Sequence, residues 1–89
     1  MKLYETVDVW RRVSKNELVR YRCFRNLQTK RYSVQSSDFY KLPMDLKRAT
    51  FLEKQYLELL AEQAPDDRAA SFDTLSEAIQ VHEQAFSQS

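Results

Sequence analysis

The residues with the most direct potential for covalent chemistry are Cys23 and His82, each the only one of its type in the 89-residue chain. A thiol nucleophile and an imidazole base can act together when their side chains lie within hydrogen-bond reach. Cys23, however, falls on the apolar alternation of a predicted strand, where a cysteine behaves as a small buried hydrophobic residue. His82 falls on the apolar stripe of a predicted helix. We therefore expect no catalytic residue and no enzymatic activity.

The sequence lacks the residue spacings that metal and cofactor binding require. One histidine and one cysteine provide neither a CxxC nor an HxxxH pair for zinc. Asp66 and Asp67 form too short a run for a calcium loop and indicate a turn between helices. The chain contains no glycine, so it has no P-loop, no dinucleotide-binding GxGxxG motif and no nucleophile elbow. We expect no metal and no cofactor.

Charge divides the chain into two halves. Residues 1–48 hold 12 Lys/Arg against 5 Asp/Glu, a net of +7, whereas residues 49–89 hold 2 against 8, a net of −6. Seven of the eleven aromatic residues lie in the basic half. Such an arrangement is typical either of a nucleic-acid-binding face or of two halves that neutralise each other.

The elements that must position these side chains begin with three strands in the basic half, over residues 4–13, 18–25 and 31–36. The second strand is the clearest, because Val19, Tyr21 and Cys23 alternate with arginines. Polar residues at 14–17 and 26–30 indicate short turns, and these favour an antiparallel meander. Without glycine, a turn position with positive φ must be taken by Asn, Asp, Ser or Lys.

Helical periodicity takes over after Pro43. Residues 45–63 place apolar side chains along one stripe, with Asp45 as the expected N-cap. We expect Ser71 to cap a second helix. Its apolar stripe follows the 3-4-3-4 spacing of helix–helix contacts and comprises Phe72, Leu75, Ile79, His82 and Phe86.

The order of these elements predicts an α+β fold, because strands precede helices. We expect a three-stranded antiparallel meander followed by a two-helix hairpin, β-β-β-α-α, with both helices on one sheet face. A chain of this length forms one domain. We therefore predict a single domain over 1–89, built from a basic β-meander at 1–42 and an acidic helical hairpin at 43–89.

The register of the first two strands decides which side chains share a face. If residues 15–17 form a three-residue loop, the core face carries Val7, Val9, Val13, Val19, Tyr21, Cys23, Tyr32 and Val34. The opposite face then carries Trp10, Arg12, Arg20, Arg22, Phe24, Arg31, Ser33 and Gln35. A two- or four-residue loop would instead move one strand's side chains to the other face. Hydrophobic segregation favours the first register, which we predict.

The second face combines aromatic rings with arginines, the residue types that anchor interfaces. We predict a partner- or nucleic-acid-binding surface formed by Trp10, Arg12, Arg20, Arg22, Phe24 and Arg31. The expected function is that of a small protein-interaction domain or regulatory subunit, whose partner is another protein or a second copy of this chain. The alternative is binding of RNA or single-stranded DNA by base stacking and phosphate contacts. An ordinary solvated face, with arginine stems covering apolar surface, would have the same composition.

Features of targeting are absent from the sequence. The first eight residues, MKLYETVD, have no apolar core of a signal peptide. No run approaches 18 apolar residues, so we expect no membrane association. A single cysteine forms no internal disulfide. The expected compartment is the cytoplasm.

Overall fold

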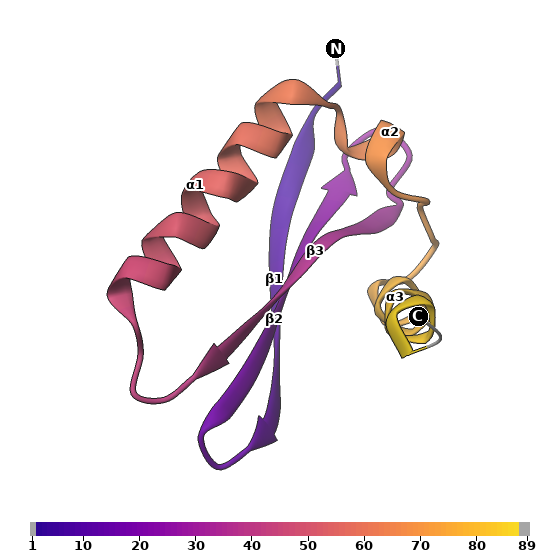
Figure 1. The fold of residues 1–89 in the computed structure, drawn as a ribbon. Helices are drawn as coiled ribbons and strands as arrows, with labels where there is room; N and C mark the ends of the chain where they lie inside the picture. The colour runs from indigo at the N-terminus through magenta and orange to yellow at the C-terminus, as the bar shows by residue number, and fades with distance from the viewer. Residues whose placement is uncertain (1, 88–89) are drawn as a thin grey trace.

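The computed structural model describes residues 2–87, except the side chains of residues 86 and 87. It contains a three-stranded sheet followed by helices, which confirms the predicted α+β class (Figure 1). The elements are β1 (Tyr4–Ser14), β2 (Glu17–Asn26), β3 (Tyr32–Lys41), α1 (Leu46–Glu62), α2 (Pro65–Arg68) and α3 (Leu75–Ser87). Only the one-turn helix α2 has no counterpart in the sequence prediction.

The sheet is the predicted antiparallel meander, in the order β1-β2-β3. Its first turn has two residues rather than three, but a bulge between Arg12 and Ser14 restores the predicted parity. Val9 consequently lies opposite Tyr21, and the two faces segregate as expected. Val13 is the exception, because it is the extra residue of the bulge and is 47% exposed. Its predicted place on the core face is therefore wrong.

The second turn shows how the chain manages without glycine. The Asn26 side-chain oxygen accepts hydrogen bonds from the backbone N–H groups of Gln28 and Thr29. Lys30 takes the one positive-φ position among the described residues, at 62°. Strand β3 then continues to Lys41, beyond the predicted end at residue 36.

Helix α3 packs on one face of the sheet and completes the apolar core. Tyr21, Cys23 and Val34 cluster there with Ala78 of α3. The helix begins later than predicted, because the Thr74 hydroxyl, rather than Ser71, accepts the hydrogen bond from the backbone of the first turn. Leu75 and Ile79 of the predicted stripe pack against the core, whereas the side chain of Phe86 lies outside the described residues.

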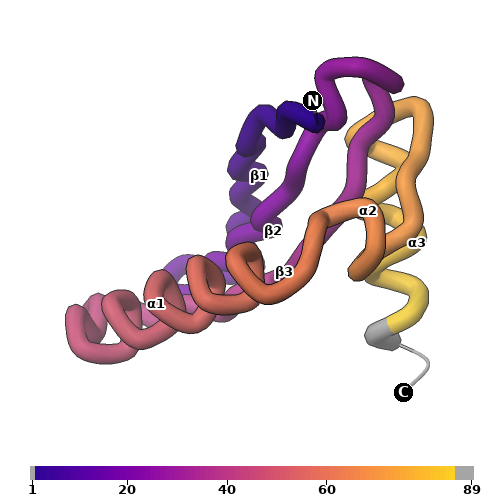
Figure 2. Tube along the Cα trace, turned by 90° about the horizontal axis from the view of Figure 1, so that it is seen from above, coloured from indigo at the N-terminus to yellow at the C-terminus, as the bar shows by residue number. Residues whose placement is uncertain are grey.

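Helix α1 covers the opposite face of the sheet. Its Tyr56 ring stacks on Phe24, with 6.1 Å between ring centroids, and its Glu53 carboxylate lies 2.8 Å from Arg22. Figure 2 shows α1 and α3 on different sides of the strands. The prediction of a helical hairpin on one face is therefore wrong, because β2 offers large side chains on both of its faces.

The link between the two helices passes around the β3 edge of the sheet. Phe72 in this link exchanges two backbone hydrogen bonds of 2.8 Å with Tyr32 of β3. Asp66 of α2 accepts hydrogen bonds from Tyr4 at 2.9 Å and from Asn26 at 3.0 Å. These contacts hold the segment between α1 and α3 where it crosses from one sheet face to the other. None of the helices described in residues 2–87 has the length and apolar content to cross a membrane.

Candidate functional site

The predicted basic-aromatic surface has a buried centre. Arg22 and Phe24 are only 2% and 3% exposed, since α1 lies over them. The Arg22 guanidinium donates to Asp38 at 2.7 Å, pairs with Glu53 at 2.8 Å, and lies 4.5 Å from the Tyr56 ring centroid. The hydrogen bond from Arg22 lowers the pKa of the Glu53 carboxyl below its ordinary value. The expectation that these two residues lie on an open face is wrong.

Two further predicted arginines lie apart from this centre. Arg31 donates to the Ser71 hydroxyl at 3.0 Å and to its carbonyl at 2.8 Å, and it pairs with Asp73. It thereby ties the start of β3 to the segment before α3. Arg12 lies on the surface near the first turn, where its one described contact is a 3.5 Å hydrogen bond to the Lys15 carbonyl. The structure therefore does not bring all six predicted residues into one patch.

Trp10 and Arg20 do remain together at the surface. The Arg20 guanidinium lies over the Trp10 ring at 5.3 Å, donates to Asp8 at 2.7 Å, and lies 3.7 Å from Glu53. The ring of Tyr40 lies 5.6 Å from that of Trp10. Trp10 itself is half exposed. A tryptophan fixed by neighbours and open to solvent on one side is a suitable binding anchor.

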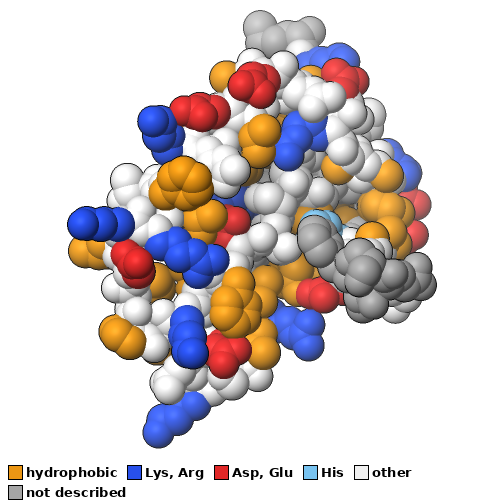
Figure 3. Space-filling model, viewed as in Figure 1, with side chains coloured by type: hydrophobic (Ala, Val, Ile, Leu, Met, Phe, Trp, Pro, Cys, Tyr) orange, Lys and Arg blue, Asp and Glu red, His pale blue; other side chains and the backbone are white. Residues whose placement is uncertain are grey.

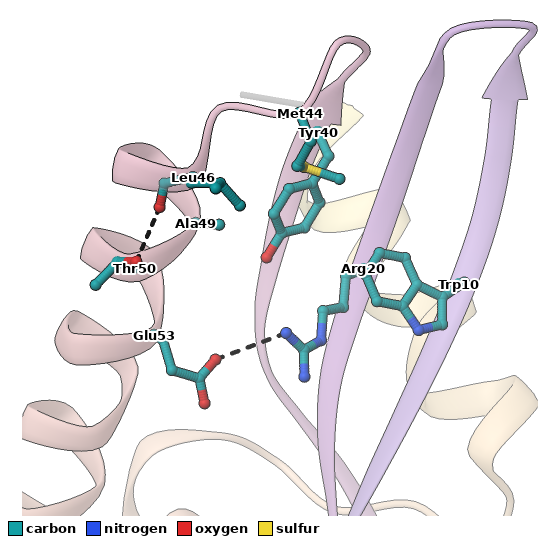
Figure 4. A pocket seen from close by; sticks show the side chains of 8 residues that line it. All are labelled: Trp10, Arg20, Tyr40, Met44, Leu46, Ala49, Thr50 and Glu53. Carbon is teal, nitrogen blue, oxygen red and sulfur yellow. Dashed lines mark hydrogen bonds and ion pairs between the residues drawn. The ribbon is translucent and has the colours of Figure 1, made fainter.

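These residues form one wall of an open groove between the sheet and the first turns of α1. Its volume is about 440 Å³. Figure 4 shows the strand residues and the helix residues facing each other across it. The groove is lined by Trp10, Arg20, Tyr40, Met44, Leu46, Ala49, Thr50 and Glu53.

The second wall is positioned by the start of α1. Asp45 is the N-cap, as predicted, and its side chain accepts from the backbone N–H groups of Lys47 at 3.0 Å and Arg48 at 3.2 Å. The cap places Leu46 in the first turn, where it is 76% exposed. Met44, in the connection before the helix, is also exposed. The groove therefore combines apolar side chains on both walls with an Arg20–Glu53 ion pair that joins the walls at one end, called its floor below (Figure 4).

Sequence reasoning missed the helix side of this groove. The apolar stripe predicted over residues 45–63 includes Leu46, which was therefore expected to be packed, and Met44 had no assigned role. A signal was present, because Leu42, Met44 and Leu46 place three large apolar residues around Pro43, more than the start of one amphipathic helix needs. All three are exposed in the structure.

The cysteine and histidine are not brought together as a catalytic pair. Cys23 is 1% exposed, and burial raises the pKa of its thiol to about 11. His82 instead lies 3.1 Å from the Ser37 hydroxyl and edge-on to Tyr21. Burial lowers the pKa of His82. The Ser37 contact joins α3 to β3. Over residues 2–87, no group of three or more His, Cys, Asp or Glu side chains is placed to hold a metal ion.

The charged groups form no continuous basic field on the face seen in Figure 3. Basic, acidic and apolar side chains alternate there. No protein-family model matches this chain, and comparison with curated proteins and with solved structures finds no match. The groove and the residues around it are therefore the features of this chain that bear on its function.

Proposed function

We propose that this chain is a non-catalytic binding domain that recognises another protein through the groove between Trp10 and α1. One observation carries the proposal. Half-exposed Trp10 and largely exposed Leu46 line the same 440 Å³ groove, although neither side chain is needed in the apolar core. Removing such apolar surface from water is favourable by about 25 cal/mol for each Å², a gain that opposes the entropic cost of association.

The floor of the groove defines the chemistry of the partner. Arg20 and Glu53 lie at its base as a partly exposed ion pair, with the guanidinium over the Trp10 ring. The proposed ligand places a large apolar side chain between the walls, with polar groups beside it that can bond the Arg20–Glu53 pair. The fitting ligand is therefore a protein segment that presents a leucine, methionine or aromatic residue.

The predicted alternative, binding of RNA or single-stranded DNA, has less support in the structure. Arg20, Arg22 and Arg31 are all held by carboxylates, which compete with phosphate. Arg22 and Phe24 are buried and so unavailable for base stacking. The basic side chains on the face seen in Figure 3 are interspersed with acidic ones, whereas nucleic-acid affinity depends chiefly on contacts of basic residues with phosphate.

The single tryptophan makes the proposal directly testable. Because Trp10 lines the groove and the chain has no other tryptophan, its emission reports occupancy of this site. Peptides selected from a displayed random library are expected to contain a large apolar residue and to shift the emission to shorter wavelength. Leu46→Asp should weaken these peptides at least tenfold, because a carboxylate would then face the apolar ligand.

A matched control is available on the same helix. Leu57 is exposed but does not line the groove, so Leu57→Asp should leave peptide affinity unchanged. Equal loss in both variants, or selected peptides that leave the Trp10 emission unaltered, would refute the groove as the binding site. Tight binding of single-stranded RNA with steep salt dependence, in place of peptide binding, would favour the nucleic-acid alternative.

A further inference from the structure

The two edge strands of the sheet differ in how far other segments pair with them. The β3 edge is partly closed, because Phe72 forms a bridge with Tyr32. The β1 edge is eleven residues long, and within residues 2–87 β1 is paired with β2 alone. Figure 2 shows open space on the outer side of β1. A long unpaired edge is a template for pairing with another strand.

The backbone groups that point outward from β1 follow from its pairing with β2. Leu27 donates its N–H to the Leu3 carbonyl at 3.0 Å. Antiparallel residue pairs alternate between hydrogen-bonded and non-hydrogen-bonded, so the odd-numbered residues of β1 direct their backbone groups toward β2. The even-numbered residues direct theirs to the open edge. The bulge before Ser14 ends this regular segment, which therefore covers residues 4–12.

The charges along this segment are ordered by sign. Glu5 lies in its first half, Asp8 at its midpoint, and Arg11 and Arg12 in its second half. Protection of an edge against pairing requires charge but no such order. An antiparallel copy of the same segment, however, reverses the order and places Glu5 of each copy beside the basic second half of the other. The edge is complementary to itself.

We propose that a second copy of this chain pairs its β1 with β1 in antiparallel orientation, about a two-fold axis at Asp8. Centring on Asp8 pairs the whole regular segment, since residue 8 is the midpoint of 4–12. Glu5 then lies opposite Arg11 of the second copy, and Val7 lies opposite Val9 of the second copy. The outward-pointing even residues of both copies form the hydrogen-bonded pairs, as the ladder requires.

The arrangement is consistent with the rest of the fold. Pairing residues of equal parity keeps equivalent sheet faces together, so both α3 helices lie on one side of a six-stranded sheet and both α1 helices on the other. The interface is symmetric, as in most homodimers. Two copies of Asp8 meet at the axis, where like charges are unfavourable. Each is already ion-paired with its own Arg20 at 2.7 Å, which offsets the repulsion.

Charge exchange between Glu5 and Arg11 tests the register. Both side chains are more than half exposed, and their ion pairs with Arg25 and Glu83 are long, at 3.8 and 3.4 Å, so substitution should leave the monomer folded. Glu5→Arg or Arg11→Glu alone creates two like-charge pairs across the axis. Each is expected to raise the dimer dissociation constant about tenfold or more in sedimentation velocity. The double exchange, Glu5→Arg with Arg11→Glu, should restore it.

Controls use exposed charges on α1. Glu62→Arg and Arg48→Glu make the same charge changes on exposed residues of α1 rather than on β1 and should leave the dissociation constant unchanged. Leu46→Asp should also leave dimerisation unaltered, so that failure of this proposal and failure of the groove proposal are distinguishable. A wild-type chain that stays monomeric to millimolar concentration, or a dimer insensitive to both single substitutions, would overturn the edge pairing.

Discussion

The two faces of strand β2 illustrate two ways of packing a helix on a sheet. On one face, Tyr21 and Cys23 contact Ala78 of α3 in an apolar cluster in which these three residues are at most 2% exposed. On the other, Arg22 and Phe24 are covered by α1 through an ion pair and stacked rings. No residue of α1 is itself fully buried. The α3 face thus forms the core. On the α1 face, apolar side chains remain exposed and are available for binding.

This difference has a physical origin in the side chains that alternate along β2. On the α3 face, Tyr21, Cys23 and Ala78 are apolar and almost completely buried, so the packing excludes water. Arginine stems and aromatic rings hold α1 farther from the strands and leave an open groove near its first turns. Regions with few buried apolar contacts open locally at low free-energy cost. We expect α1 to be the more adaptable helix, which suits a binding surface.

The largest expected loss of stability comes from a substitution on the α3 face of β2. Tyr21→Ala removes a fully buried ring and should lower the free energy of unfolding by about 4 kcal/mol in urea denaturation. Tyr21→Phe is the matched control, because the hydroxyl is buried without a hydrogen-bond partner among the described residues. It should be neutral or slightly stabilising. A loss of similar size in both variants would contradict the role of the ring in the core.

The next effect is on the α1 face. Arg22→Met keeps the volume but leaves Asp38 and Glu53 without their buried partner, and should cost about 3 kcal/mol. Amide hydrogen exchange should then accelerate in α1 more than in α3, because only α1 is attached through this group. Arg11→Met, which breaks an exposed pair, should cost less than about 1 kcal/mol. Equal acceleration in both helices would show that the two faces are not independent.

A smaller effect concerns the groove wall alone. Asp45→Ala removes the N-cap that fixes the first turn of α1 and should cost about 1 kcal/mol. The change should appear as faster hydrogen exchange at residues 46–50 and as weaker peptide binding in the groove. Asp45→Ser retains a capping oxygen and should restore both properties. Retained peptide affinity in the alanine variant would show that the first turn does not position the groove.

The sequence predicted the α3 face more accurately than the α1 face, and the reason lies in the range of the interactions. Period-two alternation identified Val19, Tyr21 and Cys23 as core, and the structure confirms that face. Arg22 was expected in solvent, since an arginine in a strand carries no sign of burial. Its partners, Asp38 and Glu53, lie in other elements, and no local periodicity encodes an ion pair between distant segments.

Only the strand wall of the groove was predicted, because the other wall depends on where a distant helix packs. Trp10 and Arg20 were identified because they alternate on one face, whereas Leu46 belongs to a helix whose position relative to the sheet was wrongly expected. Once α1 and α3 are assigned to opposite faces, the exposed start of α1 lies across the groove from Trp10 (Figure 4). The bulge at Val13 could not be predicted from local periodicity either, because it is an extra residue that compensates for a turn of two residues rather than three.

The smallest predicted effect is a pH dependence that separates the faces. His82, on the α3 side, has its pKa lowered from 6.5 by burial, so the unfolded chain binds more protons near that pH. Stability from this site is present above about pH 6.5 and decreases as pH falls through the folded-state value. Glu53, on the α1 side, has its pKa lowered from 4.5, chiefly by the hydrogen bond from Arg22. Its contribution is present above about pH 4.5 and is lost below it.

Urea denaturation as a function of pH should therefore show two separate decreases in stability as the solution is acidified. His82→Gln should remove the first decrease, and Glu53→Gln should remove the second while leaving the first in place. Tryptophan emission should report only the second step strongly, because Trp10 and Glu53 both line the groove and His82 lies on the opposite face. Loss of both steps in one variant would mean that the two faces titrate as one unit, contrary to the separation that the packing of β2 implies.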